Sequence, residues 1–322
     1  MSKAIRMHKT GGPEVLVWED VDPGKPGVGE ALIRQTAVGL NFIDTYIRSG
    51  LYPAALPMIL GSEAAGVVES VGEGVTQVRA GDRVAYTAPG AYAEERVIAA
   101  DKLVVLPDSV NDQQAAAMML KGMTAQYLVR RIYPAKSGDT VLIHAAAGGV
   151  GSILCQWAKH LGATVIGTVG SDEKAVAARA NGCDYTIVYT RENFTERVRQ
   201  ITGGAGVPVV YDSAGKDTFE GSLNCLRPRG LMISYGNSSG AVPPFAIGQL
   251  AAKGSLFLTR PTLGHYTATR EELVATANDL FDVVGRGIVK IQINQTYPLR
   301  EAAQAHRDLE ARKTTGCTVL LP

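Results

Sequence analysis

Short apolar runs separated by turn residues fill the first third of this chain, and a longer rhythm of strands and helices follows them. The runs are the segments 3–7, 31–38, 66–71, 83–86 and 103–106. Gly and Pro punctuate them, as in 23–27. Closely spaced strands with turn residues between them predict a compact β-barrel-like domain. Near residue 112 the pattern changes, and Ala, Met and Leu over 113–132 predict a helix that leads into a second domain.

The segment 137–174 has the pattern of a strand, a helix and a second strand. An apolar run at 140–144 has the length and β-branched character of a buried strand. Apolar residues at helical spacing follow and end at Gly162, as helices often do. A second apolar run at 164–167 completes a βαβ unit.

The turn between this strand and helix has the spacing of a dinucleotide fingerprint. Ala146, Gly148 and Gly151 occupy its three small-residue positions, with Gly149 and Val150 between the glycines. Glycine lets the backbone approach a pyrophosphate, whose charge the N–H groups at a helix N-terminus bind. A glycine-rich turn that serves only close helix packing is the alternative. The place of the motif between a strand and a helix favours a cofactor site.

The residues after the second strand favour NADPH. NAD sites usually carry a carboxylate about twenty residues past the glycines, where it holds the ribose 2′-hydroxyl. Here Gly170 and Ser171 form the tip, Asp172 falls in the first turn of the next helix, and Lys174 follows. A hydroxyl and a lysine beside the ribose suit a 2′-phosphate. Lys174 by itself could equally be a solvated helix residue.

The alternation of strands and helices continues after residue 174. Strands are expected at 186–189, 207–211, 230–235 and 255–259, and helices at 191–201 and 217–226. The strand from Ser255 to Thr259 is a candidate sheet edge, at which two subunits could join their sheets in a homodimer.

The last sixty residues begin with a helix and are expected to return to the first domain. Thr269 and Glu272 form a capping box. The helix that follows it has one apolar face, made of Leu273, Ala277, Leu280 and Val284. A strand near 292–297, a helix at 300–310 and a strand at 317–321 complete the chain.

Composition and charge exclude several classes of function. A chain of 322 residues is long enough for two domains. The net charge is +1, from 32 basic and 31 acidic residues, so no strong field attracts nucleic acid or a membrane surface. The absence of a long apolar run and of a signal-peptide core predicts a soluble cytoplasmic protein. The four scattered cysteines are expected to be reduced core thiols.

Five longer motifs resemble those of one enzyme family. They are GLNFIDTY at 39–46, RSGLY at 48–52, GSEAAG at 61–66, HAAAGGVG at 144–151 and GNSSG at 236–240. Over its whole length the chain is similar to the zinc-independent NADPH:quinone oxidoreductases, the zeta-crystallin-like branch of the medium-chain dehydrogenase/reductase superfamily. The resemblance implies an α/β fold with a GroES-like catalytic domain at 1–124, a Rossmann NADPH-binding domain at 125–261 and a segment at 262–322 that returns to the catalytic domain.

The same resemblance argues against a catalytic metal. Zinc alcohol dehydrogenases of this superfamily carry a cysteine where this chain has Asn41 and a histidine where it has Ser62, and their four-cysteine structural zinc site is missing. A catalytic zinc needs about three His, Cys or carboxylate side chains and an open position. These positions cannot supply them, so a metal-free reductase is expected.

The resemblance also assigns site residues. Asn41, Asp44, Tyr46 and Tyr52 would line the cleft beside the nicotinamide, with Thr124 and Asn237 on the nicotinamide half of the cofactor. Asn41 and Ser213 are also assigned to cofactor binding. The fingerprint residues Gly148, Gly149, Val150 and Gly151, with Gly170, Ser171, Lys174 and Tyr189, would hold the pyrophosphate and the adenosine phosphate. Arg260 would approach the quinone from the other side.

Plainer interpretations of some of these residues remain open. Asn41 and Asp44 could be turn residues, and the two tyrosines could be packing aromatics. Arg260 by itself is typical of a surface or interface charge. His144, on the buried strand, is expected to be a satisfied core histidine.

The resemblance implies transfer of hydride, or of single electrons in two turns, from NADPH to a quinone. Reduction of an activated carbon–carbon double bond in an enal or enone is a second hypothesis, because it needs the same cofactor and a carbonyl-polarising group. A third hypothesis is a non-enzymatic NADPH-binding or RNA-binding protein. The low net charge argues against RNA, since such affinity is largely electrostatic.

Overall fold

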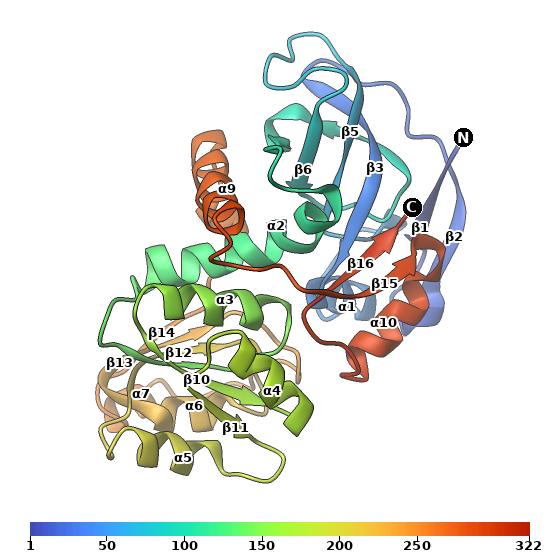
Figure 1. Ribbon diagram of the computed structural model, residues 1–322. Helices are drawn as coiled ribbons and strands as arrows, with labels where there is room; N and C mark the ends of the chain where they lie inside the picture. The colour runs from blue at the N-terminus through green and yellow to red at the C-terminus, as the bar shows by residue number, and fades with distance from the viewer. The chain divides into compact units, whose positions relative to one another are not determined.

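The computed structural model describes residues 1–322 and divides into two units (Figure 1). Each unit is built around its own group of strands. The first unit consists of Met1–Met123, Thr267–Gly287 and Ile291–Pro322. The second consists of Thr124–Tyr266 and Ile288–Lys290. The C-terminal residues therefore share a unit with the N-terminal strands.

The first unit is built on a seven-stranded sheet in which β15, β16, β3, β5, β6 and β8 follow one another and β7 pairs with β3. The bounds are β3 Glu30–Leu40, β5 Glu63–Val71, β6 Arg83–Thr87, β7 Glu95–Ala99, β8 Val104–Val105, β15 Ile293–Pro298 and β16 Cys317–Leu321. A smaller sheet has the order β2-β1-β4, with β1 Ser2–Met7, β2 Leu16–Val21 and β4 Met58–Ile59. Aliphatic residues of both sheets pack around the fully buried Tyr86 and Tyr92.

Four helices belong wholly or largely to the first unit. They are α1 Phe42–Ser49, α2 Asp112–Tyr127, α9 Arg270–Gly285 and α10 Ala302–Glu310, and the 3-10 turns are Pro13–Val15, Ala100–Lys102 and Leu299–Glu301. The hydroxyl of Thr269 accepts a hydrogen bond from the Glu272 N–H (3.2 Å), so the N-cap half of the predicted capping box of α9 is confirmed. Leu280 of α9 packs where a side chain on Gly122 of α2 would lie.

Three strands and one helix of the first unit were not predicted. Strand β4 has only two residues. Strands β2 and β7 are half exposed and carry charged residues, so their apolar pattern is weak. Helix α1 is eight residues long and ends at Gly50, whose φ of +83° favours glycine. A helix this short gives little periodicity to detect.

The second unit is a parallel sheet in the order β11-β10-β9-β12-β13-β14. The strands are β9 Thr140–Ile143, β10 Thr164–Val169, β11 Tyr185–Val188, β12 Val207–Asp212, β13 Leu226–Ser234 and β14 Phe257–Thr259. The helices are α3 Gly149–His160, α4 Asp172–Ala180, α5 Phe194–Ile201, α6 Phe219–Cys225, α7 Gly248–Ala252 and α8 Leu263–Tyr266, and a π-helical turn Leu128–Ile132 follows α2. The α3 and α4 helices cover one face of the sheet and α5 and α6 the other (Figure 1).

This second sheet confirms the predicted α/β class, and its order contains a topological switch point. From β9 the chain adds β10 on one side, and later β12 on the other. Ligands of such sheets bind outside the carboxyl ends of the strands at this point. The fingerprint turn, which follows β9, therefore stands where a dinucleotide would bind.

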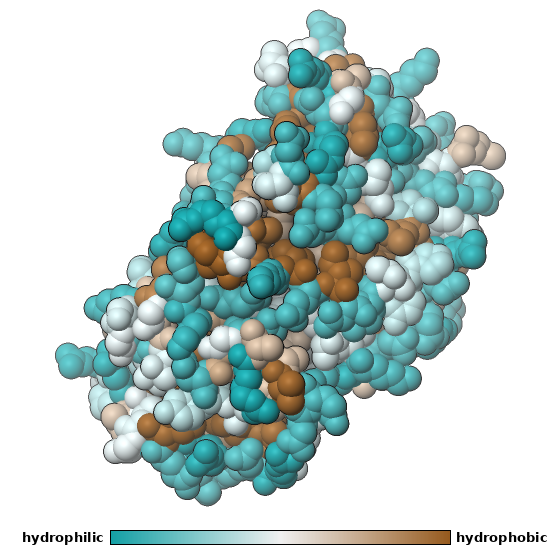
Figure 2. Space-filling model, in the orientation of Figure 1, coloured by the Kyte–Doolittle hydropathy of each residue, from teal (hydrophilic) through white to brown (hydrophobic).

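Surface and interior also follow the composition. The four cysteines are free and buried, as expected. No helix has the length and apolar character needed to cross a bilayer. On the face drawn in Figure 2, hydrophilic side chains cover most of the area and hydrophobic ones form smaller groups.

Candidate active site

The fingerprint turn is shaped by close backbone packing. Gly148 is the N-cap residue of α3, and no side chain caps the helix. The first N–H groups of α3 therefore have no side-chain acceptor, which is the arrangement that binds a pyrophosphate. Ala145 adopts a left-handed φ of +52°, and its carbonyl oxygen accepts the N–H of Gly148 (2.9 Å). A dinucleotide therefore meets backbone here rather than side chains.

Gly151 is the least replaceable residue of this turn. A Cβ atom there would lie 2.9 Å from the Ala146 Cα and would collide with the Ala145 carbonyl oxygen. We expect Gly151→Ala to destabilise the protein by about 1–3 kcal/mol and to weaken NADPH binding, measured by urea denaturation and by fluorescence titration. Gly248→Ala is the matched control, because nothing lies within 4 Å of its Cβ position. Equal NADPH affinity in both variants would contradict this role for Gly151.

Four predicted residues lie together at the ends of β10 and β11. The Tyr189 hydroxyl oxygen lies 2.9 Å from the position of a Cβ on Gly170. Ser171 is the N-cap of α4, and its hydroxyl accepts the N–H of Lys174 (3.3 Å). Lys174 is therefore in the first turn of α4, one turn after the glycine tip. This grouping can hold a phosphate through a hydroxyl, a helix N-terminus and an ammonium.

Two carboxylates adjoin this group. That of Glu173 accepts a hydrogen bond from the Ser171 side chain, whereas that of Asp172 is engaged elsewhere. Both oxygens of Asp172 accept hydrogen bonds from the Arg191 guanidinium, at 2.5 and 2.6 Å. The contact holds the pKa of Asp172 below its usual range through the hydrogen bond and the charge of Arg191. Because this pair is exposed, it adds little stability. Arg191 does, however, offset the negative charge of Asp172, which would otherwise disfavour a 2′-phosphate.

The residues predicted for the nicotinamide half belong to the second unit. The hydroxyl of Thr124 is hydrogen-bonded to Tyr127, although burial still raises the pKa of that tyrosine. The Ser213 carbonyl oxygen accepts the N–H of Ser238 (3.1 Å). Asn237 closes a turn in which its carbonyl oxygen accepts the N–H of Gly240 (2.9 Å). Two loops, after β12 and β13, are thus fastened to each other.

Arg260 contacts the second of these loops. Its guanidinium donates to the Ser234 carbonyl oxygen (2.8 Å) and to that of Gly236 (3.3 Å). These bonds support the backbone next to Asn237. The direct approach of Arg260 to a quinone stays a prediction.

In the first unit, Asn41 is fixed by a buried ion pair. Its amide donates to Glu63 (2.8 Å), and Glu63 also accepts from the Lys121 ammonium and the Leu120 N–H, both at 2.6 Å. Glu63 is fully buried and the Lys121 side chain is 7% exposed. Burial lowers the pKa of Lys121, but the facing carboxylate and its neighbours raise it by more. The sequence prediction missed this pair. A single lysine within the apolar run of α2 is the signal that could have indicated it.

Asp44 gathers three hydrogen bonds at the start of α1. Its carboxylate accepts from the Asn41 N–H (2.9 Å), the Ser62 hydroxyl (2.5 Å) and the Tyr92 hydroxyl (3.0 Å). The carboxyl is fully buried. Burial raises its pKa to about 6, although these three donors and the charge of Lys121 lower it in part. Asn41 and Asp44 also form the capping box of α1, so Asp44 has the structural role considered above in addition to its contacts with Ser62 and Tyr92, and its role toward a quinone stays a prediction.

Tyr46 and Tyr52 pack against each other. Their ring centroids are 5.3 Å apart in an edge-to-face arrangement, and Tyr46 is 8% exposed. The N–H of Tyr52 also donates to the Tyr46 carbonyl oxygen (3.0 Å). This contact is the packing role considered above, and the role of the two rings toward a quinone stays a prediction.

His144 and His306 are both buried histidines with satisfied rings. His144 contacts the hydroxyls of Thr168 (2.8 Å) and Ser222 (2.9 Å), which confirms its role in the core. His306 of α10 contacts the Tyr92 hydroxyl (3.1 Å) and the Arg48 guanidinium (3.0 Å). Sequence reasoning missed His306, since its partners are distant in the chain.

His306 makes stability sensitive to acid. Burial and then Arg48 lower its pKa from 6.5 to about 3. Between these values the unfolded chain binds a proton that the folded one does not, so stability falls as the pH falls. His306→Gln keeps an acceptor and a donor. When the pH is lowered from 7 to about 5, we expect the free energy of unfolding of this variant to fall by about 2 kcal/mol less than that of the wild type. Urea denaturation at both pH values measures the two losses. Equal losses would contradict the role given to His306.

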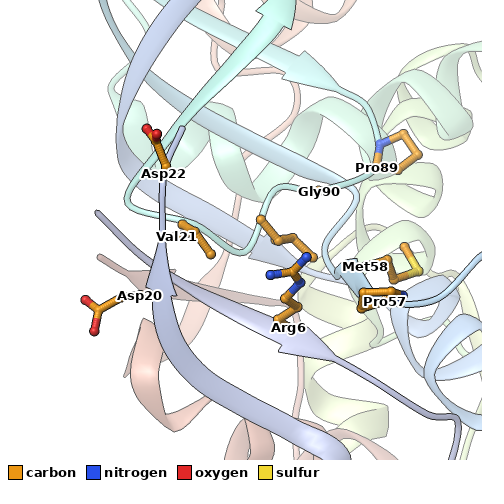
Figure 3. Close-up of a pocket in the computed structure, with 9 residues that line it drawn as sticks. Arg6, Asp20, Val21, Asp22, Pro57, Met58, Pro89 and Gly90 are labelled. Atoms are coloured by element: carbon orange, nitrogen blue, oxygen red, sulfur yellow. The ribbon is translucent and has the colours of Figure 1, made fainter. Parts of the chain in front are cut away.

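A separate pocket of about 510 Å³ opens on the first unit (Figure 3). Its lining includes Arg6, Asp20 and Met58, and none of the candidate residues described above is among the residues that form it. The structure also contains no group of three His, Cys, Asp or Glu side chains arranged to hold a metal. Where zinc ligands would stand, the Asn41 amide and the Ser62 hydroxyl donate to carboxylates instead.

Family models match both units. The description "Alcohol dehydrogenase GroES-like domain" covers residues 27–108, and "Zinc-binding dehydrogenase" covers residues 149–279. The predicted combination of a GroES-like and a Rossmann-type domain is thereby confirmed.

Individual relatives are similar along the whole chain. A quinone oxidoreductase of Pseudomonas aeruginosa is 57% identical over 100% of both chains. A 2-haloacrylate reductase of Burkholderia sp. is 50% identical over 100% of this chain and 99% of the relative. The solved structure of Escherichia coli quinone oxidoreductase complexed with NADPH has a TM-score of 0.98 and 51% identity, covering 99% of this chain and 100% of that one.

Proposed function

The chain belongs to the zinc-independent quinone oxidoreductases of the medium-chain dehydrogenase/reductase superfamily, and we propose that it reduces a quinone with NADPH. The observation that carries this proposal is the sequence identity of 57% and 51% to two quinone oxidoreductases over the full length of this chain. A fingerprint turn suited to a pyrophosphate supports it independently of any relative.

The residues present fit NADPH. The uncapped N-terminus of α3 would bind the pyrophosphate, and Ser171, Lys174 and Tyr189 would hold the 2′-phosphate, with Asp172 neutralised by Arg191. When bound, NADPH supplies the hydride or the electrons. The Ser213 and Asn237 loops and Thr124 would orient its nicotinamide half, with Arg260 supporting the backbone beside Asn237.

The first unit would orient the quinone. A quinone is already a strong electrophile, so positioning its ring and binding its developing phenolate oxygen by hydrogen bonds can suffice. Asn41, held by Glu63, and the Asp44 group are the polar residues proposed for this task, with Tyr46 and Tyr52 as the proposed aromatic wall.

Reduction of an activated double bond is the second candidate. The 50% identical relative is named 2-haloacrylate reductase, so an unsaturated carboxylate or carbonyl compound could take the place of the quinone. The same cofactor site would serve both reactions.

A substrate panel separates the two candidates. Loss of the reduced-nicotinamide absorbance is measured with 1,4-benzoquinone, 9,10-phenanthrenequinone, 2-hexenal and 2-chloroacrylate, each with NADPH and with NADH. Fast turnover of the quinones with NADPH supports the main proposal. Turnover of the unsaturated compounds alone favours the second candidate, and no turnover with any acceptor despite tight NADPH binding rejects both.

We further propose a cytoplasmic homodimer. Strand β14 is a sheet edge, and the Phe257 side chain on it is 60% exposed, which suits pairing of two sheets. Four free thiols fit a reducing compartment. Sedimentation equilibrium of the wild type and of Phe257→Asp tests the dimer: a monomeric wild type would contradict it.

A further inference from the structure

A continuous set of hydrogen bonds runs through the first unit from a half-buried hydroxyl to a surface carboxylate. In order, its members are Ser62, Asp44, Tyr92, His306, Arg48 and Glu310. Asp44, Tyr92 and His306 are fully buried and Arg48 is 2% exposed. These side chains come from α1, α10 and two loops that are far apart in the sequence.

The direction of these hydrogen bonds follows from the donors. Arg48 has only N–H donors, so the His306 Nδ1 must accept from it. The neutral ring then carries its proton on Nε2 and donates to the Tyr92 oxygen. Tyr92 in turn donates its hydroxyl proton to Asp44. Because arginine does not give up a proton, this part of the network orients Tyr92 and does not conduct protons to Glu310.

The other end of the network differs in chemistry. Ser62 is half buried and its hydroxyl lies 2.5 Å from the second oxygen of Asp44. A hydroxyl accepts one hydrogen bond while it donates another. When Asp44 is protonated on this oxygen, it can donate to Ser62, whose own proton is then free to point away from the carboxyl.

Asp44 is suited to store that proton. The titratable and charged groups that act on it directly are Lys121 of α2 and Tyr92. His306 lies one hydrogen bond further, beyond Tyr92, and Arg48 lies beyond His306. Lys121 is itself held by Glu63, so no cation contacts the Asp44 carboxylate directly. Burial dominates and raises the pKa of Asp44 to about 6, close enough to neutral pH for both protonation states to be populated.

We propose that Ser62 and Asp44 deliver the proton that completes quinone reduction, with Tyr92, His306 and Arg48 as positioning residues. This inference rests on the proposed function. Two electrons and one proton arrive at the quinone as hydride. Ser62 gives its hydroxyl proton to the phenolate oxygen while it takes the proton of Asp44. The hydroquinone leaves, and solvent returns one proton to the Asp44 carboxylate, so the sum is quinone, NADPH and H⁺ converted to hydroquinone and NADP⁺.

The test compares kcat and kcat/KM for 1,4-benzoquinone over about pH 5 to 9 in the wild type, Ser62→Ala, Ser62→Thr and Tyr92→Phe. We expect wild-type kcat/KM to fall as the pH rises through about 6. Ser62→Ala should lower kcat about 100-fold and remove this pH dependence, and Ser62→Thr, which keeps a hydroxyl, should restore most of the rate. Tyr92→Phe removes a donor that lowers the pKa of Asp44, so its falling limb should move to higher pH.

NADPH titration by fluorescence accompanies each variant and shows that the cofactor unit is intact. A Ser62→Ala variant with wild-type kcat and pH profile would overturn the inference, as would a Tyr92→Phe variant whose limb does not move. A wild type that reduces no quinone would instead reject the proposed function, before any variant is compared.

Discussion

Replacing Lys174 with alanine is expected to raise KM for NADPH about 10- to 100-fold and to leave KM for NADH nearly unchanged. Lys174 stands in the first turn of α4 beside Ser171 and the Gly170–Tyr189 contact. A hydrogen bond to a charged group contributes about 1.5–3 kcal/mol, which corresponds to this range. Steady-state kinetics with both cofactors measure the ratio of the two KM values.

Arg179→Ala is the matched control for Lys174. It removes one positive charge from the last turn of the same helix, where Arg179 donates to Thr186 (2.6 Å). Its effect on NADPH should be smaller, because the Arg179 guanidinium is engaged with Thr186 at that end of the helix and is expected to act on a phosphate only through its charge, which reaches Asp172. If both variants lose NADPH affinity equally, the lysine contributes only general charge and the assignment of the 2′-phosphate site is wrong.

The grouping of the residues proposed for the cofactor half was predictable because its signals are local. The fingerprint, the glycine tip, Ser171 and Lys174 all lie within one βαβ unit, and spacing along the chain reproduces their neighbourhood in space. The role of Asp172 was harder, because its partner Arg191 is 19 residues away. A carboxylate near the ribose usually indicates an NAD site, but it no longer disfavours a 2′-phosphate once an arginine neutralises its charge.

The proton-handling half could not be predicted in the same way. Tyr92 is 48 residues from Asp44, and His306 is 214 residues from Tyr92. Only the tertiary fold brings a loop, a short helix and the C-terminal helix together, so no pattern of spacing marks these residues. Their buried hydrogen bonds become visible only once burial and direction are known.

The largest effect on stability is expected from breaking the buried ion pair of Lys121 and Glu63, which contacts Asn41. Lys121→Met leaves the Glu63 carboxylate buried without its cation, and such a loss costs about 3–5 kcal/mol. Glu63 would keep only the Asn41 amide and the Leu120 N–H as donors. Urea denaturation followed by circular dichroism measures the loss.

The double variant Glu63→Gln with Lys121→Met separates an uncompensated charge from lost packing. A neutral amide at position 63 needs no cation, and its one oxygen can still accept the Leu120 N–H, while its NH2 then faces the Asn41 amide. Because an unpaired buried charge costs more than one lost hydrogen bond, the double variant should be more stable than Lys121→Met alone. Lys102→Met is the exposed control. Its ion pair with Asp101 has side chains 47% and 54% exposed, so its loss should cost at most about 1 kcal/mol. A double variant no more stable than Lys121→Met would show that the lysine stem, and not its charge, supports this part of the first unit.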